Sequence, residues 1–374
     1  MPKRLAVPSE TLTLRQLNRA TLARQMLLAR ERTTALRAIE RLVALQAQWP
    51  RPPFVGLWSR LEPFARADLR GPLERRQVVR ATFIRGTLHL VAAKDFAALR
   101  PAIQPVLTAG MQAILRGKKA AGLDLDGLTA LARKVLKEEP RTFEGLRERF
   151  LLAYPKDNER AMGYAVRMLL PLVQVPDEGA AWEFAAQARF ALADEWLGRA
   201  VPTGPAGPNE LVRRYLAAYG PASVADAQAW SGLGGLRDTF DALRPGLRTF
   251  RDEQGRELFD LPDAPRPDGD VPAPVRLVPE YDNLIVSRAD ERFVARGERP
   301  RVFLSALRIA ATVLVDGFVA GTWKLEQKKG TATVSIEPFA PFAPRTRKEV
   351  VTEAEALARF AEPDARAFEV HVAR

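Results

Sequence analysis

Two glutamines, Gln46 and Gln48, are the residues whose type and spacing most clearly suggest chemistry. They end a helix expected over residues 34–48, which must stop near Pro50. On a helix, side chains two positions apart point about 200° apart, whereas an extended turn would bring both amides to one cavity. Neutral amides beside a basic surface can hydrogen-bond a base edge, a phosphate or a water. The alternative is a solvated helix end, because glutamine is common on surfaces.

The positive charge of the chain is concentrated around these glutamines. The formal charge is +12, and the pI is near 10.2. Residues 1–100 contain 19 Lys or Arg and seven Asp or Glu, whereas the remaining 274 residues contain 38 of each. A basic region of this kind favours a polyanionic partner, most often nucleic acid. A membrane-surface patch or a solubilising face is the alternative.

A second set of polar residues lies in residues 85–91, RGTLHLV. Arg85, Thr87 and His89 alternate, so on a strand their side chains would share one face. We expect Arg85 to pair with a phosphate of DNA and Thr87 to donate a hydrogen bond to one. His89 is expected to bond a backbone group or a flanking nucleotide. The alternative is a polar strand face with a structural histidine.

Further basic residues gather at a hairpin that is expected to turn at QKKG. Lys324, Lys328 and Lys329 lie near its tip, and a basic hairpin can follow a groove or the backbone of DNA. Lysines that protect an edge strand would show the same pattern. Arg51, which follows the glutamines, completes the candidate DNA contacts.

Several other residues near these positions are given secondary roles. Asp95 and Asp282 are the carboxylates to test if the glutamines do not act, and no role follows from the sequence for Asp282. Trp49 and Trp58 lie close enough to the glutamines to line a binding site, but packing is the favoured role. Trp230 sits among apolar neighbours and is expected in the core.

Composition excludes several classes of site. The chain has no cysteine and only two histidines, which excludes disulfides, thiolate or histidine-rich metal sites and a cysteine nucleophile. No P-loop, dinucleotide fingerprint, HExxH or GxSxG motif occurs. No apolar run is long enough to span a membrane, and the N-terminus lacks the apolar core of a secretory signal. We expect a cytoplasmic, nucleoid-associated protein without a metal or cofactor.

The elements expected around these residues form three units in series, each with helices followed by a strand pair, which is the order of a winged helix. The first unit is expected to have helices over 13–29, 34–48 and 54–66, with strands over 78–92 broken at Gly86. The second unit is expected to have helices capped by Asp126 and Thr142, a helix over 161–171 and a strand pair after residue 170. The third is expected to have a helix ending at Gly220, a helix capped by Ser223, a helix over 233–244 and a hairpin at Gln254-Gly255.

The last hundred residues are different and rich in strands. Asp316-Gly317 between two β-branched runs predicts a hairpin. A helix is expected over 353–361, followed by a last strand. The predicted fold class is α+β: tandem winged-helix (helix-turn-helix) units followed by an antiparallel domain resembling a β-barrel. The boundaries are expected at 1–122, 123–200, 207–262 and 275–374.

Seven segments, in order, resemble the AlkZ/YcaQ family of winged-helix DNA glycosylases. They are LTLRQLNRATLARQML, LVALQAQWPRPPFVGLWSRL, VVRATFIRGTLHLVAAKDF, MLLPLVQVP, YLAAYGPASVADAQAWSGL, PEYDNLIVSRAD and VLVDGFVAGTWK. The resemblance covers nearly the whole chain. It implies tandem winged helices with a C-terminal β-domain, and excision of N7-alkylated purines or unhooking of interstrand crosslinks. The family's catalytic Gln-Φ-Gln motif falls on Gln46, Ala47 and Gln48. The central alanine is a small choice, and Gln48 disfavours the related Gln-Φ-Asp branch.

The implied chemistry suits amide side chains. An N7-alkylguanine already carries positive charge, so it leaves without a strong general acid. A water must still be placed, and an oxocarbenium-like sugar must be stabilised. Glutamine does not titrate near neutral pH, but its carbonyl can accept a hydrogen bond from a water. The hypothesis is that Gln46 and Gln48 hold this water between them in a monofunctional glycosylase.

Two alternatives stay open beside the enzyme. A non-catalytic winged-helix protein, either a transcription regulator or a damage binder, would need a base-reading recognition helix, and the helix ending in glutamines argues weakly against it. A scaffold with a basic face would show no steep salt dependence of DNA binding. The expected partner of the enzyme is double-stranded DNA carrying alkyl lesions. A monomer that binds no membrane is the expected form.

Overall fold

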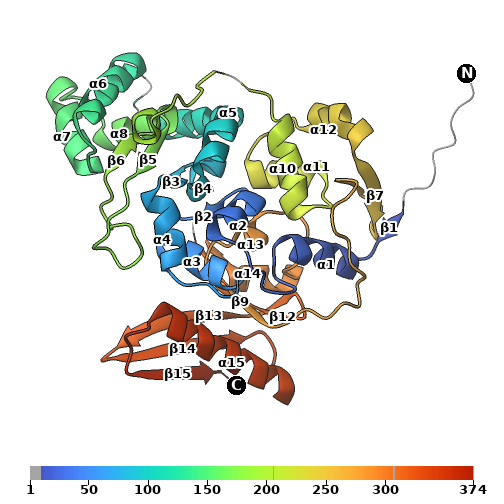
Figure 1. The fold of residues 1–374 in the computed structure, drawn as a ribbon. Helices are drawn as coiled ribbons and strands as arrows, with labels where there is room; N and C mark the ends of the chain where they lie inside the picture. Colours follow the sequence, from blue (N-terminus) through green and yellow to red (C-terminus); the bar gives the residue numbers. More distant parts are fainter. Residues whose placement is uncertain (1–9, 119, 121, 205, 306–307, 374) are drawn as a thin grey trace, which may run out of the picture.

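The computed structural model describes residues 10–118, 120, 122–204, 206–305 and 308–373. Helices and sheets are mixed, which confirms the α+β class (Figure 1). Helical segments fill most of the upper part of the view, and a large C-terminal sheet with one long helix lies below them. Residues 1–9 of the expected first unit lie outside the described residues.

The glutamines lie in a region of short helices and strands. Its elements are α1 (Leu14–Arg24), α2 (Ala35–Leu42), β2 (Leu45–Gln46), α3 (Arg51–Trp58), α4 (Ala67–Glu74), β3 (Val78–Thr82) and β4 (Leu88–Ala92). Of Thr33 and Thr34, the two caps that the sequence offers for this helix, Thr34 caps α2 by accepting a hydrogen bond from the N–H of Arg37. The expected helical end at the glutamines is wrong, because Val43 adopts a φ of 70° and the chain continues as strand β2. The helix expected over 54–66 begins and ends earlier, as α3.

A helix of 25 residues, α5 (Ala93–Gly117), follows β4 and was not expected from the sequence. It contains Pro101 and Pro105, which cannot donate backbone hydrogen bonds. The apolar side chains of Phe96, Ile103 and Leu107 nevertheless bury one face in the main core. Burial of this face stabilises the helix despite its prolines.

The next two regions follow the expected order with shifted bounds. Asp124, not Asp126, caps α6, whereas Thr142 and Ser223 cap helices as expected. The elements are α6 (Leu125–Glu138), α7 (Phe143–Ala153), α8 (Glu159–Leu169), β5 (Leu172–Gln174), β6 (Phe190–Leu192) and α9 (Ala193–Leu197). Then follow α10 (Asn209–Tyr219), α11 (Val224–Ser231), α12 (Arg237–Leu243), β7 (Arg248–Asp252) and β8 (Glu257–Asp260), and β7 also pairs with β1 (Thr11–Leu12).

One five-stranded sheet joins the first two expected units. Its strand order is β2-β4-β3-β5-β6, and β3 pairs with β5 through Arg80 opposite Gln174. Strands of the first and second regions therefore share backbone hydrogen bonds. The domain boundaries and the winged-helix character of the units stay predictions.

The C-terminal region is an open sheet and not a barrel. Its strand order is β15-β14-β13-β12-β9, and in the described residues its two edge strands do not pair with each other. Strand β15 runs parallel to β14, so the expected fully antiparallel arrangement is also wrong. The expected hairpin at Asp316-Gly317 is confirmed. The elements are β9 (Arg276–Val278), α13 (Asn283–Val286), α14 (Arg299–Val302), β10 (Phe303–Ser305), β11 (Arg308–Ile309), β12 (Ala311–Val315), β13 (Phe318–Lys328), β14 (Thr331–Pro338), α15 (Pro344–Ala361) and β15 (Ala367–Val372).

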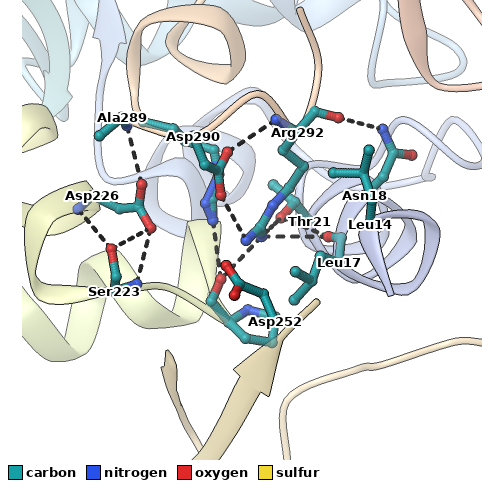
Figure 2. A network of polar contacts seen from close by, with 12 residues as sticks. Leu14, Leu17, Asn18, Thr21, Ser223, Asp226, Asp252, Ala289, Asp290 and Arg292 are labelled. Atoms are coloured by element: carbon teal, nitrogen blue, oxygen red, sulfur yellow. Dashed lines mark hydrogen bonds and ion pairs between the residues drawn. The ribbon is translucent and has the colours of Figure 1, made fainter. Parts of the chain in front are cut away.

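A buried polar network holds α1 against the third region (Figure 2). Arg292 donates to the hydroxyl of Thr21 at 2.9 Å and pairs with Asp290 at 3.1 Å. Asp226 accepts from the N–H of Ala289 at 3.0 Å and from the hydroxyl of Ser223 at 2.8 Å. Burial alone would raise the pKa of Asp290, but neighbouring arginines, above all Arg292, lower it to about 2. The segment after α13 therefore joins parts of the chain that are far apart in sequence.

Candidate active site around Gln46 and Gln48

Gln46 is held from two sides. It lies on β2 directly opposite His89 of β4, so the two side chains share one face of the sheet. The side chain is 9% exposed, and its Oε1 accepts a hydrogen bond from Nη2 of Arg85 at 3.0 Å. The amide of Gln46 is therefore fixed, and one lone pair of its carbonyl oxygen is already used.

Gln48 is exposed, and its backbone is fixed rather than its side chain. The N–H of Ala47 donates to the carbonyl of Leu88 at 2.7 Å, which extends the strand pairing by one residue. Arg80 donates from Nε to the carbonyl of Ala47 at 2.9 Å and from Nη2 to that of Gln48 at 3.1 Å. Strand β2 ends at Gln46, and Gln48 lies in the bend that follows it.

Arg85 does not lie on the strand where the sequence had placed it. It belongs to a short 3-10 turn, η1 (Ile84–Gly86), and has a φ of 54°. The expected common strand face for Arg85, Thr87 and His89 is therefore wrong. Besides Gln46, the guanidinium binds the carbonyl of Trp230 on α11 at 2.5 Å. Burial lowers the pKa of Arg85 to about 10, which still leaves the group charged at neutral pH.

His89 is fully buried beside this arginine. Its Nδ1 lies 3.0 Å from the carbonyl of Thr87. Burial, and secondly the charge of Arg85, lower the pKa of His89 to about 3, so its ring is neutral at physiological pH. The Thr87 hydroxyl donates to the carbonyl of Ile84. The structure thus gives His89 no exposed surface for the expected DNA contact and places it as a backbone-bonded neighbour of Gln46.

Of the remaining candidate DNA contacts, the three lysines lie apart from the glutamines, whereas Arg51 follows them closely in the chain. Lys324, Lys328 and Lys329 are exposed on the β13–β14 hairpin, which Figure 1 shows at some distance from β2. The Nζ of Lys328 lies 2.5 Å from a carboxylate oxygen of Glu326. Arg51 begins α3, and its guanidinium lies 3.7 Å from Glu280. The basic hairpin is therefore separate from the glutamines, and the DNA-binding roles of these residues stay predictions.

The positive charge of the first hundred residues is partly neutralised inside the protein. Arg24 pairs with Asp260 at 2.7 Å and Arg60 with Asp282 at 2.8 Å, and these four side chains are buried. The acids come from beyond residue 100, so the charge balance counted along the sequence overstates the charge of the surface. Among the described residues, three exposed arginines without an acidic partner line a cavity of about 740 Å³ between α2 and α4: Arg32, Arg37 and Arg75.

The two candidate carboxylates have structural partners. Asp95 accepts hydrogen bonds from both terminal guanidinium nitrogens of Arg214. Asp282 accepts hydrogen bonds from both terminal guanidinium nitrogens of Arg60. Asp282 also caps α13, whose first residue, Asn283, donates to the carbonyl of Ala44 at 2.7 Å. The EYDN segment therefore supports the chain just before β2. The sequence singled out neither Arg80 nor Asn283.

Trp49 and Trp58 have different surroundings. Trp58 packs against Phe360, as expected. Trp49 is 62% exposed, so the favoured packing role is wrong for it. An exposed aromatic ring directly after Gln48 is available for stacking on a base. Trp230 is buried, as expected.

The described residues contain no group of three acidic or histidine side chains placed to hold a metal ion. In the same part of the chain, no helix combines the length and the apolar character that crossing a bilayer requires.

Comparison with known proteins identifies relatives of this arrangement. The family model described as "DNA glycosylase AlkZ-like" matches residues 39–360. No curated protein matches the chain. Among solved structures, the Streptomyces sahachiroi DNA glycosylase AlkZ is similar over 97% of this chain and 100% of that chain, with a TM-score of 0.78 and 21% identity.

Proposed function

The chain belongs to the AlkZ-like DNA glycosylase family, and on this premise we propose that it hydrolyses the N-glycosidic bond of N7-alkylated purines with a water held by Gln46 and Gln48. The observation that supports this most directly is the bond from Arg85 to the Oε1 of Gln46. A charge-assisted bond of this kind orients the amide before substrate arrives. Gln48, two residues further along the chain, has an exposed side chain free to bind water.

The two glutamines have unequal roles in this mechanism. Arg85 uses one lone pair of the Gln46 oxygen, so the N–H groups of Gln46 and the second lone pair of its oxygen are left to bind water or substrate. The exposed carbonyl of Gln48 is the better acceptor for the attacking water. The water's oxygen then attacks C1′ while the bond to the base breaks and the base takes the bonding electrons. The proton that the attacking water loses passes to solvent, because a glutamine amide does not titrate near neutral pH. Both amide dipoles stabilise the positive charge that develops on the sugar.

The site offers no strong acid to protonate the leaving base. His89 is neutral at physiological pH because burial holds its pKa at about 3, and Asp95 and Asp282 are engaged in ion pairs. A base that already carries positive charge can leave without that help. The absence of acid assistance from these three groups therefore favours N7-alkylated purines over undamaged ones.

The exposed position of Gln48 also favours large lesions. Gln48 and Trp49 lie on the surface and not in an enclosed pocket, so a bulky N7 adduct would meet little steric resistance there. We extend the proposal to the unhooking of interstrand crosslinks on this ground. Arg85 and His89 are the neighbours of Gln46, and neither side chain has a primary amine that could form an imine with the sugar. Direct attack by water, in a monofunctional reaction, is therefore favoured.

The test is base release from a duplex with a single N7-methylguanine. The protein should release the base and leave an abasic site, which alkali then converts to a strand break. Borohydride should trap no covalent complex, because no imine forms. A matched duplex without the methyl group should give no product. Tight binding without base release would contradict the proposal and support a non-catalytic DNA-binding protein.

A further inference from the structure

A second cavity, of about 630 Å³, lies in the helical region after α5. It is formed by α7, α8, β5 and the segment before β6, and it is separate from the glutamines. In the sheet order β2-β4-β3-β5, β5 lies three strand spacings from β2, or about 14 Å. The residues that bear on its binding chemistry are Phe143, Arg160, Tyr164, Arg167, Gln174 and Phe190.

Aromatic rings form much of the wall. Phe143 packs edge-on against Phe190, with ring centroids 4.8 Å apart. Gly163 of α8 permits the position of Phe143, because a Cβ at residue 163 would lie 2.6 Å from the Phe143 ring. Tyr164 of α8 also lines the cavity. A flat aromatic ligand would find apolar ring surfaces here.

A buried amide lies on the same wall. Gln174 is only 7% exposed, and its Oε1 has no hydrogen-bond partner among the described residues. A buried carbonyl without a hydrogen-bond partner is costly, so a ligand that donates to it would be stabilised. Because the two ends of a glutamine amide exchange by rotation, this side chain can present either an acceptor or two donors to a molecule in the cavity.

Charged residues complete the cavity wall, with the glutamates Glu144 and Glu159 beside three arginines. Arg167 lies 5.3 Å from the Tyr164 ring centroid, and its Nε is buried without a partner. Burial lowers the pKa of Arg167, so an anion beside it would recover part of the lost solvation. Arg160 is exposed and has no acidic partner in the described part of the chain. Arg147, in contrast, is paired with Glu159.

We propose that this cavity binds a nucleotide. The base would lie against the aromatic wall with its hydrogen-bonding edge at Gln174, and the phosphate would lie at Arg160 and Arg167. A free mononucleotide and a nucleotide within a DNA strand offer the same chemistry. The proposal does not depend on base release at the glutamines, because the cavity has its own binding groups.

Calorimetric titration of the full-length protein with deoxyadenosine 5′-monophosphate tests the proposal. Deoxyadenosine and inorganic phosphate should each bind at least about tenfold more weakly, since each lacks one half of the recognised group. Ala186→Trp, at an exposed position on the cavity wall, should block binding. Arg160→Gln should weaken binding about tenfold, whereas Arg149→Gln, an exposed position on α7 outside the cavity, should not.

A single-stranded oligonucleotide distinguishes the two sources of nucleotide. If the strand supplies it, Ala186→Trp and Arg160→Gln will weaken oligonucleotide binding more than Arg149→Gln does, even where the monophosphate alone binds poorly. If neither the monophosphate nor the oligonucleotide distinguishes these variants from Arg149→Gln, the proposal is wrong. Base release from methylated duplex is measured separately on the same variants, so loss of the nucleotide site and loss of the glycosylase reaction cannot be confused.

Discussion

Arg85 joins Gln46 to a distant part of the chain, donating to the glutamine oxygen at 3.0 Å and to the carbonyl of Trp230 at 2.5 Å. The strand that carries Gln46 is thereby tied to helix α11. Arg85 has a φ of 54°, a conformation rare for residues other than glycine, and it lies in the turn η1 rather than on a strand. Orientation of the candidate catalytic amide thus depends on a turn and not on the strand itself.

Removal of the Gln48 amide should abolish most of the reaction. We expect Gln48→Ala to lower single-turnover base release from an N7-methylguanine duplex by about a hundredfold or more, as for other preorganised transition-state contacts. Duplex affinity should change little. Gln254→Ala, at an exposed turn between β7 and β8, is the matched control and should retain full activity. Unchanged base release in Gln48→Ala would remove the glutamine from the mechanism.

Loss of the Arg85 guanidinium should act through Gln46. Arg85→Gln removes a charge-assisted hydrogen bond worth about 1.5–3 kcal/mol, so base release should fall about tenfold to a hundredfold. A positioning role predicts that the single-turnover rate at saturating enzyme falls while DNA affinity changes less. It also predicts that Gln46→Ala lowers the single-turnover rate much less when Arg85→Gln is already present than it does in the wild type. Additive losses in the double variant would indicate that the two residues act independently.

His89 should make stability depend on pH below neutrality. The unfolded histidine titrates near 6.5, whereas the folded one has a pKa of about 3, so the unfolded state binds the extra proton between these values. Stability should therefore fall as pH is lowered from 6.5 towards 3, by at most about 1.4 kcal/mol per pH unit from this residue. The free energy of unfolding, measured by denaturant titration at each pH, should depend less steeply on pH in His89→Leu than in the wild type.

Asp282 should prove structural. Asp282→Asn leaves the buried Arg60 without its counter-charge, which costs about 3–5 kcal/mol. Chemical denaturation should show this loss, and Asp263→Asn, at an exposed position, should show none. At a temperature where the variant is fully folded, base release should fall less than tenfold. A much larger loss of activity in a folded Asp282→Asn protein would point to a direct chemical role.

The β13–β14 hairpin should contribute to duplex binding through its charge. Lys324→Gln combined with Lys329→Gln should weaken binding and reduce the slope of log affinity against log salt by up to about 1.8, or about 0.9 for each phosphate that is no longer neutralised. The effect should be equal for methylated and unmethylated duplex, because lysine–phosphate pairs carry no base specificity. An unchanged salt dependence would place the hairpin outside the DNA interface.

Local sequence signals predicted the elements that they directly control. Asp316-Gly317 marked its hairpin, and Thr34, Thr142 and Ser223 marked helix starts, because each of these residues forms the turn or cap itself. The end of α2 could not be predicted in the same way. It depends on Val43 in a left-handed conformation, which a β-branched residue adopts only where tertiary packing holds it.

The candidate site was predicted in its residues but not in its geometry. Gln46 and Gln48 stood out by type and spacing, whereas their supports come from tertiary contacts. Arg80 and Asn283 each bind a backbone carbonyl of residues 44–48. Such bonds leave no pattern in a single sequence, since any carbonyl can accept them.

The pairing of β3 with β5 has a consequence for dissecting the protein. A fragment that stops after residue 122 would leave the outer edge of β3 bare, with the backbone groups of Ala81 and its neighbours open to another chain. Such a fragment should self-associate or precipitate even though it retains both glutamines. Soluble truncations should be those that keep the strand after α8.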